Sequence, residues 1–267
     1  MENKSQLSVE NLTFSYDKEK EILHGISASF SNGKITAILG PNGCGKSTLL
    51  NLLSGVLKPS SGNITLKGCD IREIKRTEVA RNIAVVHQKN RAPSDITVEN
   101  LVSAGRTPYK GFFKGSDKVE DQRAIEKALR DTETLEFAER PISALSGGQM
   151  QRVWMAMALA QETDILLLDE ITTFLDIHYQ LEILHLISEL NRKNGTTILM
   201  VLHDINLAFE FCDEVIIMKE GNIIAQGDIN RVVDEEILKE AFDVSAKILT
   251  IDDKKQCIFS RIGGINA

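Results

Sequence analysis

Four residues near the start of the chain have the types and the spacing of a phosphate-binding loop. The pattern G-x-x-x-x-G-K-[ST] is matched by Gly40, Gly45, Lys46 and Ser47. Glycines carry no Cβ atom, so backbone N–H groups can converge on a triphosphate there. Lys46 would reach the β- and γ-phosphates of ATP, and the Ser47 hydroxyl would take one coordination site of Mg²⁺. The alternative is a glycine-rich turn followed by a surface lysine. The predicted nucleotide-contacting set is Gly40, Pro41, Asn42, Gly43, Cys44, Gly45, Lys46, Ser47 and Thr48.

Two carboxylates follow an apolar run later in the chain. The segment Ile165–Glu170 reads ILLLDE and is typical of a buried strand that ends in Asp169 and Glu170. The carboxyl ends of such strands form the edge at which α/β sheets bind ligands. We therefore expect Asp169 to hold Mg²⁺, directly or through water, and Glu170 to orient and deprotonate an attacking water. An acid pair that favours a helix start through the helix dipole is the alternative.

A second glycine-containing motif, LSGGQ, occupies Leu145–Gln149. Ser146 and Gln149 have the spacing of a capping box, which predicts a helix over 150–160. Gly147 and Gly148 each cost about 1 kcal/mol relative to alanine in a helix, but they leave a bare helix end that an anion can approach. The chain then has two phosphate-receiving helix ends but one Lys46. A two-fold dimer uses both, with each nucleotide between the phosphate loop of one copy and Ser146–Gln149 of the other.

The elements that must position these groups follow from the periodicity of the sequence. Strands are predicted over 7–16, 22–30, 34–39, 63–67, 82–87, 164–168, 196–202, 215–218 and 223–226, and helices over 49–57, 177–192 and 234–242. Asn32-Gly33 is a hairpin signal between the second and third strands. From Lys89 the sequence no longer shows the pattern of strands, and we predict a helical insert, with helical spacing over 118–139. A further hairpin is expected around 252–255. The prediction is one α/β domain over 1–267, with a core of 1–90 and 160–240, an insert over 91–159 and a tail over 241–267.

Composition narrows the class of protein. The chain has 267 residues, a net charge of −7 and a pI near 5.4, which disfavours nucleic acid as a partner. Four cysteines without C-x-x-C spacing indicate reduced thiols in the cytoplasm. The start of the chain does not read as a signal peptide, and the longest apolar run, Ile198–Leu202, is too short to cross a bilayer.

Taken together, the motifs resemble the nucleotide-binding subunit of an ABC transporter over nearly the whole chain. They are the phosphate loop, Gln88, LSGGQ, ILLLDE, Leu175-Asp176 and His203, in this order. The resemblance implies a P-loop NTPase (RecA-like) core with an antiparallel β subdomain and a helical insert. It also implies that Gln88 reaches Mg²⁺ and the attacking water, that Asp176 lies across the dimer seam, and that His203 contacts the γ-phosphate.

The resemblance further implies that Tyr16 stacks on adenine, although on spacing alone Tyr16 could equally pack on the sheet. Likewise, His203 taken alone would be a histidine that caps the next helix. ABC ATPases of DNA repair or translation are rivals, but they typically carry long coiled coils or two cassettes, and an inactive regulatory cassette would be expected to lack Glu170 or His203. This chain has neither of the first two features and retains both residues.

Shorter motifs resemble the ATPases of iron(III)–siderophore importers, whose relatives also carry haem and cobalamin. These motifs are Asp95-Ile96-Thr97-Val98, Gly105-Arg106-Thr107-Pro108-Tyr109, Ala160-Gln161-Glu162-Thr163 and Leu175-Asp176-Ile177. The family usually has proline where this chain has Ile171 and arginine where it has Met150. The resemblance implies a peripheral subunit on the cytoplasmic face of the membrane. Its expected partners are a second copy, permease subunits contacted around Lys89–Thr97 and, indirectly, a substrate-binding protein.

Overall fold

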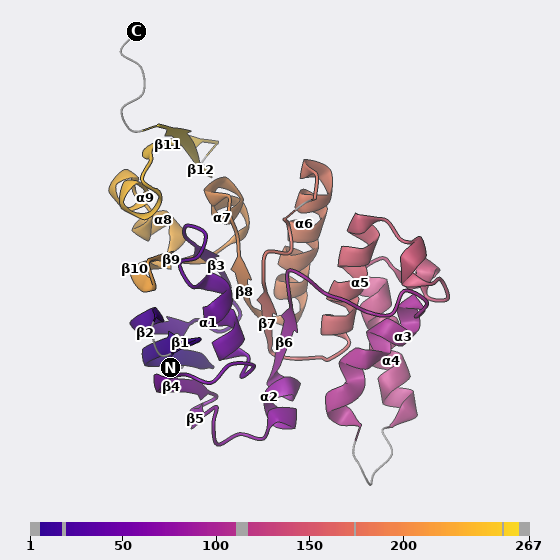
Figure 1. Cartoon of the computed structure of the whole chain (residues 1–267). Helices are drawn as coiled ribbons and strands as arrows, with labels where there is room; N and C mark the ends of the chain where they lie inside the picture. The colour runs from indigo at the N-terminus through magenta and orange to yellow at the C-terminus, as the bar shows by residue number, and fades with distance from the viewer. Residues whose placement is uncertain (1–5, 18–19, 111–116, 174, 253, 262–267) are drawn as a thin grey trace. The chain divides into compact units, whose positions relative to one another are not determined.

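The computed structural model describes residues 6–17, 20–110, 117–173, 175–252 and 254–261 (Figure 1). Residues 111–116 of the predicted insert, 253 of the predicted hairpin and 262–267 of the predicted tail lie outside the described residues. The chain divides into two compact units. Unit 1 consists of Met1–Glu73 and Thr197–Ala267, and unit 2 of Ile74–Thr196.

Unit 1 contains an antiparallel sheet built mainly from the N-terminal strands. Its members are β1 (Leu7–Ser15), β2 (Glu21–Phe30), β4 (Ser61–Leu66) and β5 (Cys69–Asp70), in the order β2-β1-β4-β5. Alternate residues of β1, among them Leu7 and Val9, are buried, as the alternating pattern of this segment predicts. Leu7 lies opposite Phe30 on one side and Leu66 on the other, so one apolar face is continuous across these strands.

The second set of strands in unit 1 carries the phosphate loop. It consists of β3 (Ile35–Leu39), β8 (Thr197–Val201), β9 (Glu214–Lys219) and β10 (Asn222–Asp228), in the order β10-β9-β3-β8. β3 pairs in parallel with both β8 and β9, and all residues of β3 and β8 are buried. Such strands read as continuous apolar runs because both of their faces are covered.

The hairpin predicted at Asn32-Gly33 is wrong. A turn does form, since the Lys34 N–H donates to the Ser31 carbonyl at 3.3 Å, but β2 and β3 belong to different sheets. β2 alternates exposed and buried residues, whereas β3 is buried on both faces, so the two strands need different surroundings. The turn therefore passes the chain from one sheet to the next.

The remaining elements of unit 1 are α1 (Lys46–Leu53), α7 (Ile205–Phe211), α8 (Ile229–Val232), α9 (Glu235–Phe242) and the hairpin of β11 (Ser245–Ile251) and β12 (Lys254–Ser260). The predicted last helix and the hairpin after it are confirmed. Asn206 joins this hairpin to α7, because its amide oxygen accepts from the Cys257 N–H at 2.7 Å and its amide nitrogen donates to the Cys257 carbonyl at 3.2 Å.

Unit 2 contains a parallel strand pair and the predicted helical insert. Its elements are α2 (Arg76–Asn82), β6 (Ile83–Val86), α3 (Val98–Ser103), η1 (Ala104–Tyr109), α4 (Lys118–Asp131), η2 (Leu135–Phe137), η3 (Ile142–Ala144), α5 (Gly147–Leu159), β7 (Ile165–Leu168) and α6 (Ile177–Asn194). β6 and β7 pair in register, so that Val86 lies opposite Leu168. The helices α3, α4 and α5 lie side by side (Figure 1). Among the helices of the described residues, none is long and apolar enough to cross a bilayer.

The helix predicted over 118–139 ends early, at Asp131. The Thr132 hydroxyl donates to the Ala128 carbonyl at 2.9 Å and lies 2.9 Å from the Thr134 hydroxyl, and both threonines are fully buried. Side-chain hydroxyls that bond to nearby backbone compete with a regular helix. The helical spacing of charged residues continues past Asp131 in the sequence, but the hydrogen bonds of the two buried threonines end the helix there.

Two of the short motifs found in the sequence contact each other around Arg106. This side chain is 2% exposed, and its guanidinium donates to Asp121 Oδ1 at 2.8 Å, to the Ala160 carbonyl at 2.9 Å and to Glu162 Oε2 at 3.0 Å. The ring of Tyr109 lies 4.0 Å from the guanidinium carbon. The network joins η1, α4 and the end of α5 through a buried cation with several partners, the arrangement in which a buried charge is tolerated.

Candidate functional site

The phosphate loop connects β3 to α1 within unit 1. Gly40 has φ 148° and Gly45 has φ 106°, so both are in backbone conformations that favour glycine. A Cβ atom on Gly40 would collide with the Met218 carbonyl, and one on Gly45 would lie 2.6 Å from Leu23 Cδ2. Gly43, by contrast, has no heavy atom within 4 Å of a Cβ built there. Packing therefore demands two glycines of the loop, and the third leaves an open side that an anion can approach.

Lys46 lies at the first position of α1 and folds back over the loop. Its side chain is 5% exposed, and Nζ donates to the Gly40 carbonyl at 2.7 Å and to the Pro41 carbonyl at 2.9 Å. A buried ammonium needs such partners. These contacts fix the charge inside the loop, and phosphate oxygens could share the same ammonium.

Tyr16 packs on the sheet, one of the two roles that the sequence left open. Its ring packs edge-on against Phe14 with centroids 4.8 Å apart, and its hydroxyl lies 3.2 Å from Thr48 Oγ1 in α1. The residue is nevertheless 64% exposed. The ring is thus anchored on the sheet beside α1 while much of its surface stays available for a planar ligand.

Cys44 lies inside the loop but is buried, and burial raises the pKa of its thiol above the ordinary value of 9.0. The thiolate is the reactive form, so a raised pKa lowers the reactive fraction at neutral pH. We expect alkylation of Cys44 to be slower than that of exposed Cys69, to accelerate as the pH rises toward and above 9.0, and to slow further with MgATP. Mass spectrometry of both labelled cysteines tests this. Equal labelling of Cys44 with and without MgATP would contradict its placement in a nucleotide site.

In unit 2, the structure brings together Gln88 and Glu170, predicted for catalysis, and Asp169, predicted as a Mg²⁺ ligand. The Asp169 N–H donates to the Val86 carbonyl at 2.9 Å, which places this residue at the end of the β6–β7 pair. Gln88 follows β6, and its Nε2 donates to Glu170 Oε2 at 2.5 Å. Glu170 has φ 51°, a left-handed conformation that costs about 1 kcal/mol or more for a residue other than glycine. Such strain persists where surrounding contacts hold it, and it directs the carboxylate toward Gln88.

The capping box of the LSGGQ motif is confirmed. Ser146 Oγ accepts from the Gln149 N–H at 3.3 Å, and Gln149 Oε1 accepts from the Ser146 N–H at 2.9 Å. The helix begins at Gly147, earlier than the predicted start at 150, because Ser146 is its N-cap. α5 therefore presents its free N–H groups directly at the motif.

The start of α6 holds the loop that follows Glu170. Asp176 is the N-cap of this helix and accepts from the Tyr179 N–H at 3.1 Å. Gln180 Nε2 donates to the carbonyls of Thr172 and Leu175, both at 3.1 Å. The sequence reasoning missed Tyr179 and Gln180. Their position within one turn of a predicted helix cap was the available signal, but their partners depend on tertiary contacts.

His203 is exposed and lies in unit 1 after β8. The next helix, α7, is capped by Asp204, whose Oδ1 accepts from the Asn206 N–H at 2.7 Å. The alternative role of His203 as the cap is therefore wrong. His203 is exposed at the carboxyl end of a parallel strand. This edge of the sheet is where α/β proteins bind ligands.

The predicted Mg²⁺ ligands are oxygen donors: the Ser47 hydroxyl, the Gln88 amide oxygen and the Asp169 carboxylate. Among the residues that the structure describes, no group of three or more His, Cys, Asp or Glu could hold a metal ion. Mg²⁺ is usually bound through one or two carboxylates, waters and substrate phosphates rather than by a cage of protein ligands. This donor set therefore fits a Mg²⁺ ion that arrives with a nucleotide.

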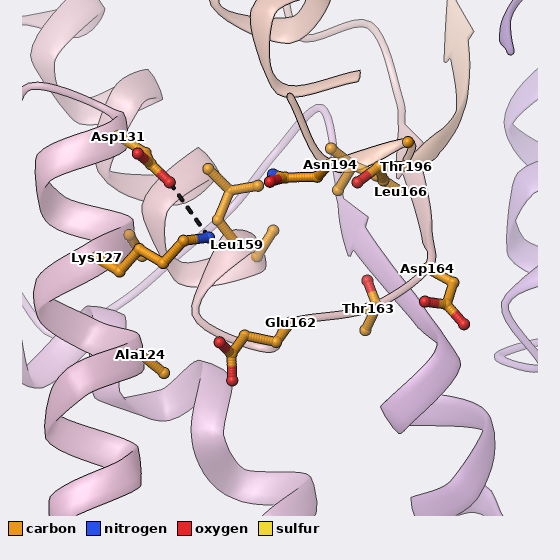
Figure 2. A pocket seen from close by; sticks show the side chains of 13 residues that line it. Ala124, Lys127, Asp131, Leu159, Glu162, Thr163, Asp164, Leu166, Asn194 and Thr196 are labelled. Atoms are coloured by element: carbon orange, nitrogen blue, oxygen red, sulfur yellow. Dashed lines mark ion pairs between the residues drawn. The ribbon is translucent and has the colours of Figure 1, made fainter. Parts of the chain in front are cut away.

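A cavity of about 220 Å³ in unit 2 is separate from these residues (Figure 2). It lies between α4 and the ends of α5 and α6, with Lys127 and Asp131 of α4 paired at 3.6 Å on one side and Asn194 on the other. None of the predicted site residues lines it. It is therefore not part of the predicted nucleotide site.

Comparisons with known proteins find relatives over most of the chain. The model of the family described as ABC transporter matches residues 23–173. The chain is 46% identical over 246 residues to the iron(3+)-hydroxamate import ATP-binding protein FhuC of Bacillus subtilis (strain 168), covering 92% of this chain and 91% of FhuC. It is 43% identical over 252 residues to the ferric enterobactin transport ATP-binding protein FepC of Escherichia coli (strain K12), covering 94% and 92%.

Solved structures show the same fold. An inward-facing structure assigned to a metal-chelate type ABC transporter matches with a TM-score of 0.83 at 28% identity, covering 98% of this chain and 99% of the other. A bacterial ABC transporter cassette solved as a dimer matches with a TM-score of 0.72 at 28% identity, covering 84% and 98%. The α/β fold of this chain is thus shared with solved ABC transporter proteins.

Proposed function

This chain belongs to the ABC transporter family, and from that premise we propose that it powers the uptake of an iron(III)–siderophore chelate as the ATP-hydrolysing subunit of an importer. The observation that carries the proposal is the pair of anion-receiving ends on one chain. One is the phosphate loop with buried Lys46, and the other is the capped, glycine-containing start of α5.

Within one copy, the phosphate loop would grip ATP. Lys46 neutralises charge on the β- and γ-phosphates, and Tyr16 stacks on the base with its exposed ring. The residues that would hold Mg²⁺ are Ser47, Gln88 and Asp169, and the ion, when bound, neutralises charge on the terminal phosphates. His203 contacts the γ-phosphate, as its place after β8 permits.

Glu170 is the proposed general base. Its carboxylate takes a proton from a water molecule, and the water oxygen then attacks the γ-phosphorus in line with the leaving oxygen of ADP. The Gln88 amide nitrogen, at 2.5 Å from Glu170 Oε2, holds one oxygen of this carboxylate in place. The backbone at Glu170, with φ 51°, holds the carboxylate in one direction.

The second copy would complete each nucleotide site. The free N–H groups at the start of α5, with Ser146, Gly147, Gly148 and Gln149, would close on the γ-phosphate bound to the other copy, and Asp176 would lie at the seam. ATP thus joins two chains, and hydrolysis removes the phosphate that both hold. Dimeric ABC cassettes among the similar structures support this arrangement.

The loop Lys89–Thr97 is the proposed contact with the membrane-spanning permease. The end of this loop and the residue after it pair with the segment that leads into α5. The Val98 N–H donates to the Arg140 carbonyl at 3.0 Å, and the Ile142 N–H donates to the Ile96 carbonyl at 3.0 Å. A displacement of the loop would therefore be transmitted through these hydrogen bonds toward Ser146. In this proposal the subunit lies on the cytoplasmic face of the membrane, as a peripheral protein.

The proposed cargo follows from the relatives, which are named for the import of iron(3+)-hydroxamate and ferric enterobactin. Uptake of haem, cobalamin or another metal complex is the alternative cargo, since the ATPase does not itself touch the transported molecule. The domain boundaries proposed for this function are a core of 1–90 and 160–240, an insert over 91–159 and a tail over 241–267.

The proposal is tested by isolating the chain together with the membrane subunits that co-purify with it and reconstituting the complex in vesicles. We expect ATP hydrolysis to rise when a substrate-binding protein loaded with an iron(III)–hydroxamate is added, and labelled iron to enter the vesicles only with ATP. If cobalamin or haem stimulates the complex and the hydroxamate does not, the alternative cargo is the correct one. A chain that co-purifies with no membrane protein would contradict the role in transport.

A further inference from the structure

Tyr179 lies where the first turn of α6 meets the first turn of α5. A Cβ atom built on Gly148 would lie 2.8 Å from Tyr179 Cδ1 and 3.1 Å from both Cε1 and Cγ. Separations below 3.0 Å essentially never occur for real Cβ atoms, so one of the two groups would have to move. Gly148 is also buried. The missing side chain at this position therefore makes room for a ring of the same chain.

Gly147, the other glycine of the motif, has the opposite surroundings. It is exposed, and no heavy atom lies within 4 Å of a Cβ atom built there. The sequence predicted the same role for both glycines, which was to leave the helix end open to an anion. The structure gives them different roles. Gly147 leaves the helix end open, whereas Gly148 lets Tyr179 cover the side of the same turn.

The ring of Tyr179 is bordered by that of the preceding residue, His178, with centroids 5.3 Å apart, and the backbone of Tyr179 is held at the start of α6. The Tyr179 N–H donates to Asp176 Oδ1 at 3.1 Å, and the neighbouring Gln180 ties the start of α6 to the Thr172 and Leu175 carbonyls, each at 3.1 Å. Tyr179 remains 37% exposed, so one edge of the ring meets Gly148 and part of the rest borders the surface. A fixed ring against a helix end restricts the directions that the first turn of α5 can take.

We propose that Tyr179 is a positioning residue for the phosphate-receiving end of α5. By packing against Gly148 it sets the direction in which the free N–H groups of this turn point, and thereby how well they meet the phosphate held by the other copy. The inference rests on the proposed function. Since this helix end would meet a nucleotide only in the dimer, Tyr179 should act on ATP-driven pairing and on kcat, and not on the first binding of ATP by one chain.

The test compares Tyr179→Ala and Tyr179→Phe with the wild type. We expect Tyr179→Ala to bind ATP as a single chain with unchanged affinity but to lose about 10- to 100-fold in kcat, because small misplacements of a catalytic constellation have effects of this size. Tyr179→Phe, which keeps the ring, should retain wild-type kcat and pairing. Lys193→Ala is the control, because Lys193 lies in the last turn of the same helix, α6, its side chain is 59% exposed, and the variant should retain kcat. A role in stability alone would lower the melting temperature without separating ATP binding from pairing.

A double-substitution cycle identifies the reason for Gly148. In the wild type, Gly148→Ala should displace the ring and reduce kcat by a similar factor. In the Tyr179→Ala background, the same substitution should have a much smaller effect, because residues in contact show strong coupling. Equal damage by Gly148→Ala in both backgrounds, or wild-type kcat and pairing in Tyr179→Ala, would overturn the inference. A wild type that never pairs on ATP would instead overturn the proposed function itself.

Discussion

We expect the Glu170→Gln variant to bind MgATP with wild-type affinity and to hydrolyse it at least about 100-fold more slowly, since a general base contributes about 10²–10⁴ in rate. The amide has the shape of the carboxylate and can still bond to Gln88, whose Nε2 lies 2.5 Å from the present Oε2. It cannot, however, take a proton from water. The unhydrolysed ATP should then keep two copies together, and the measurement is steady-state phosphate release alongside equilibrium titration of ATP.

Glu220→Gln is the matched control for this variant. Glu220 is exposed and has φ 47°, close to the 51° of Glu170, so the substitution makes the same chemical change in a similar backbone conformation. Glu220→Gln should hydrolyse ATP like the wild type. Phosphate release by Glu170→Gln at the wild-type rate would remove Glu170 from the role of base.

Lys46→Ala should lose activity for a different reason, because it weakens ATP binding itself.

The largest expected effect on stability is at Arg106. We expect Arg106→Met to lower the free energy of unfolding by about 3–5 kcal/mol, the usual result of removing one partner of a buried ion pair. The reason is that Asp121, whose side chain is 12% exposed, would lose the Arg106 donor at 2.8 Å, and the Ala160 carbonyl would lose the one at 2.9 Å. Glu162 would lose the Arg106 donor at 3.0 Å and keep only its longer pair with Arg123 at 3.4 Å among the ion pairs of this network. Urea denaturation followed by circular dichroism measures the change.

Arg130→Met is the control for this substitution, because Arg130 pairs with Glu126 on the surface of α4, the helix that carries Asp121, with a side chain that is 63% exposed. Exposed pairs of this kind contribute about 0–1 kcal/mol. The double variant Arg106→Met, Asp121→Leu should recover much of the lost stability, since apolar residues of similar volume often replace a buried pair well. Equal losses from Arg106→Met and Arg130→Met would contradict the role assigned to the network.

The strands and helices that carry the motifs were predictable because each has a local signature. β3 and β7 are continuous apolar runs, and α5 begins at a capping box that can be read from Ser146 and Gln149. The errors came where tertiary contacts decide. Asn32-Gly33 gives a turn in either case, but only the burial of β3 on both faces shows that it does not pair with β2.

Some residues of the site were also predictable from the sequence, and others depend on tertiary contacts. Gln88 and Glu170 are 82 residues apart in sequence, and they meet in the structure. The apolar strand that ends in two carboxylates predicted Glu170, and the family resemblance predicted Gln88. Tyr179 and the divided roles of Gly147 and Gly148 had no such signal. A glycine that leaves space for an anion and a glycine that leaves space for a ring are the same letter in the sequence, and only their neighbours distinguish them.

The central claim is that two copies of this chain close over ATP. The most direct measurement is the rate of hydrolysis per molecule across a wide dilution series, with the molecular mass of Glu170→Gln in MgATP determined over the same concentrations. The account predicts that the rate per molecule rises with protein concentration as pairs form, and that Glu170→Gln becomes a stable dimer only with ATP. A rate per molecule that is independent of dilution, from a chain that stays monomeric with ATP at every concentration, would contradict it.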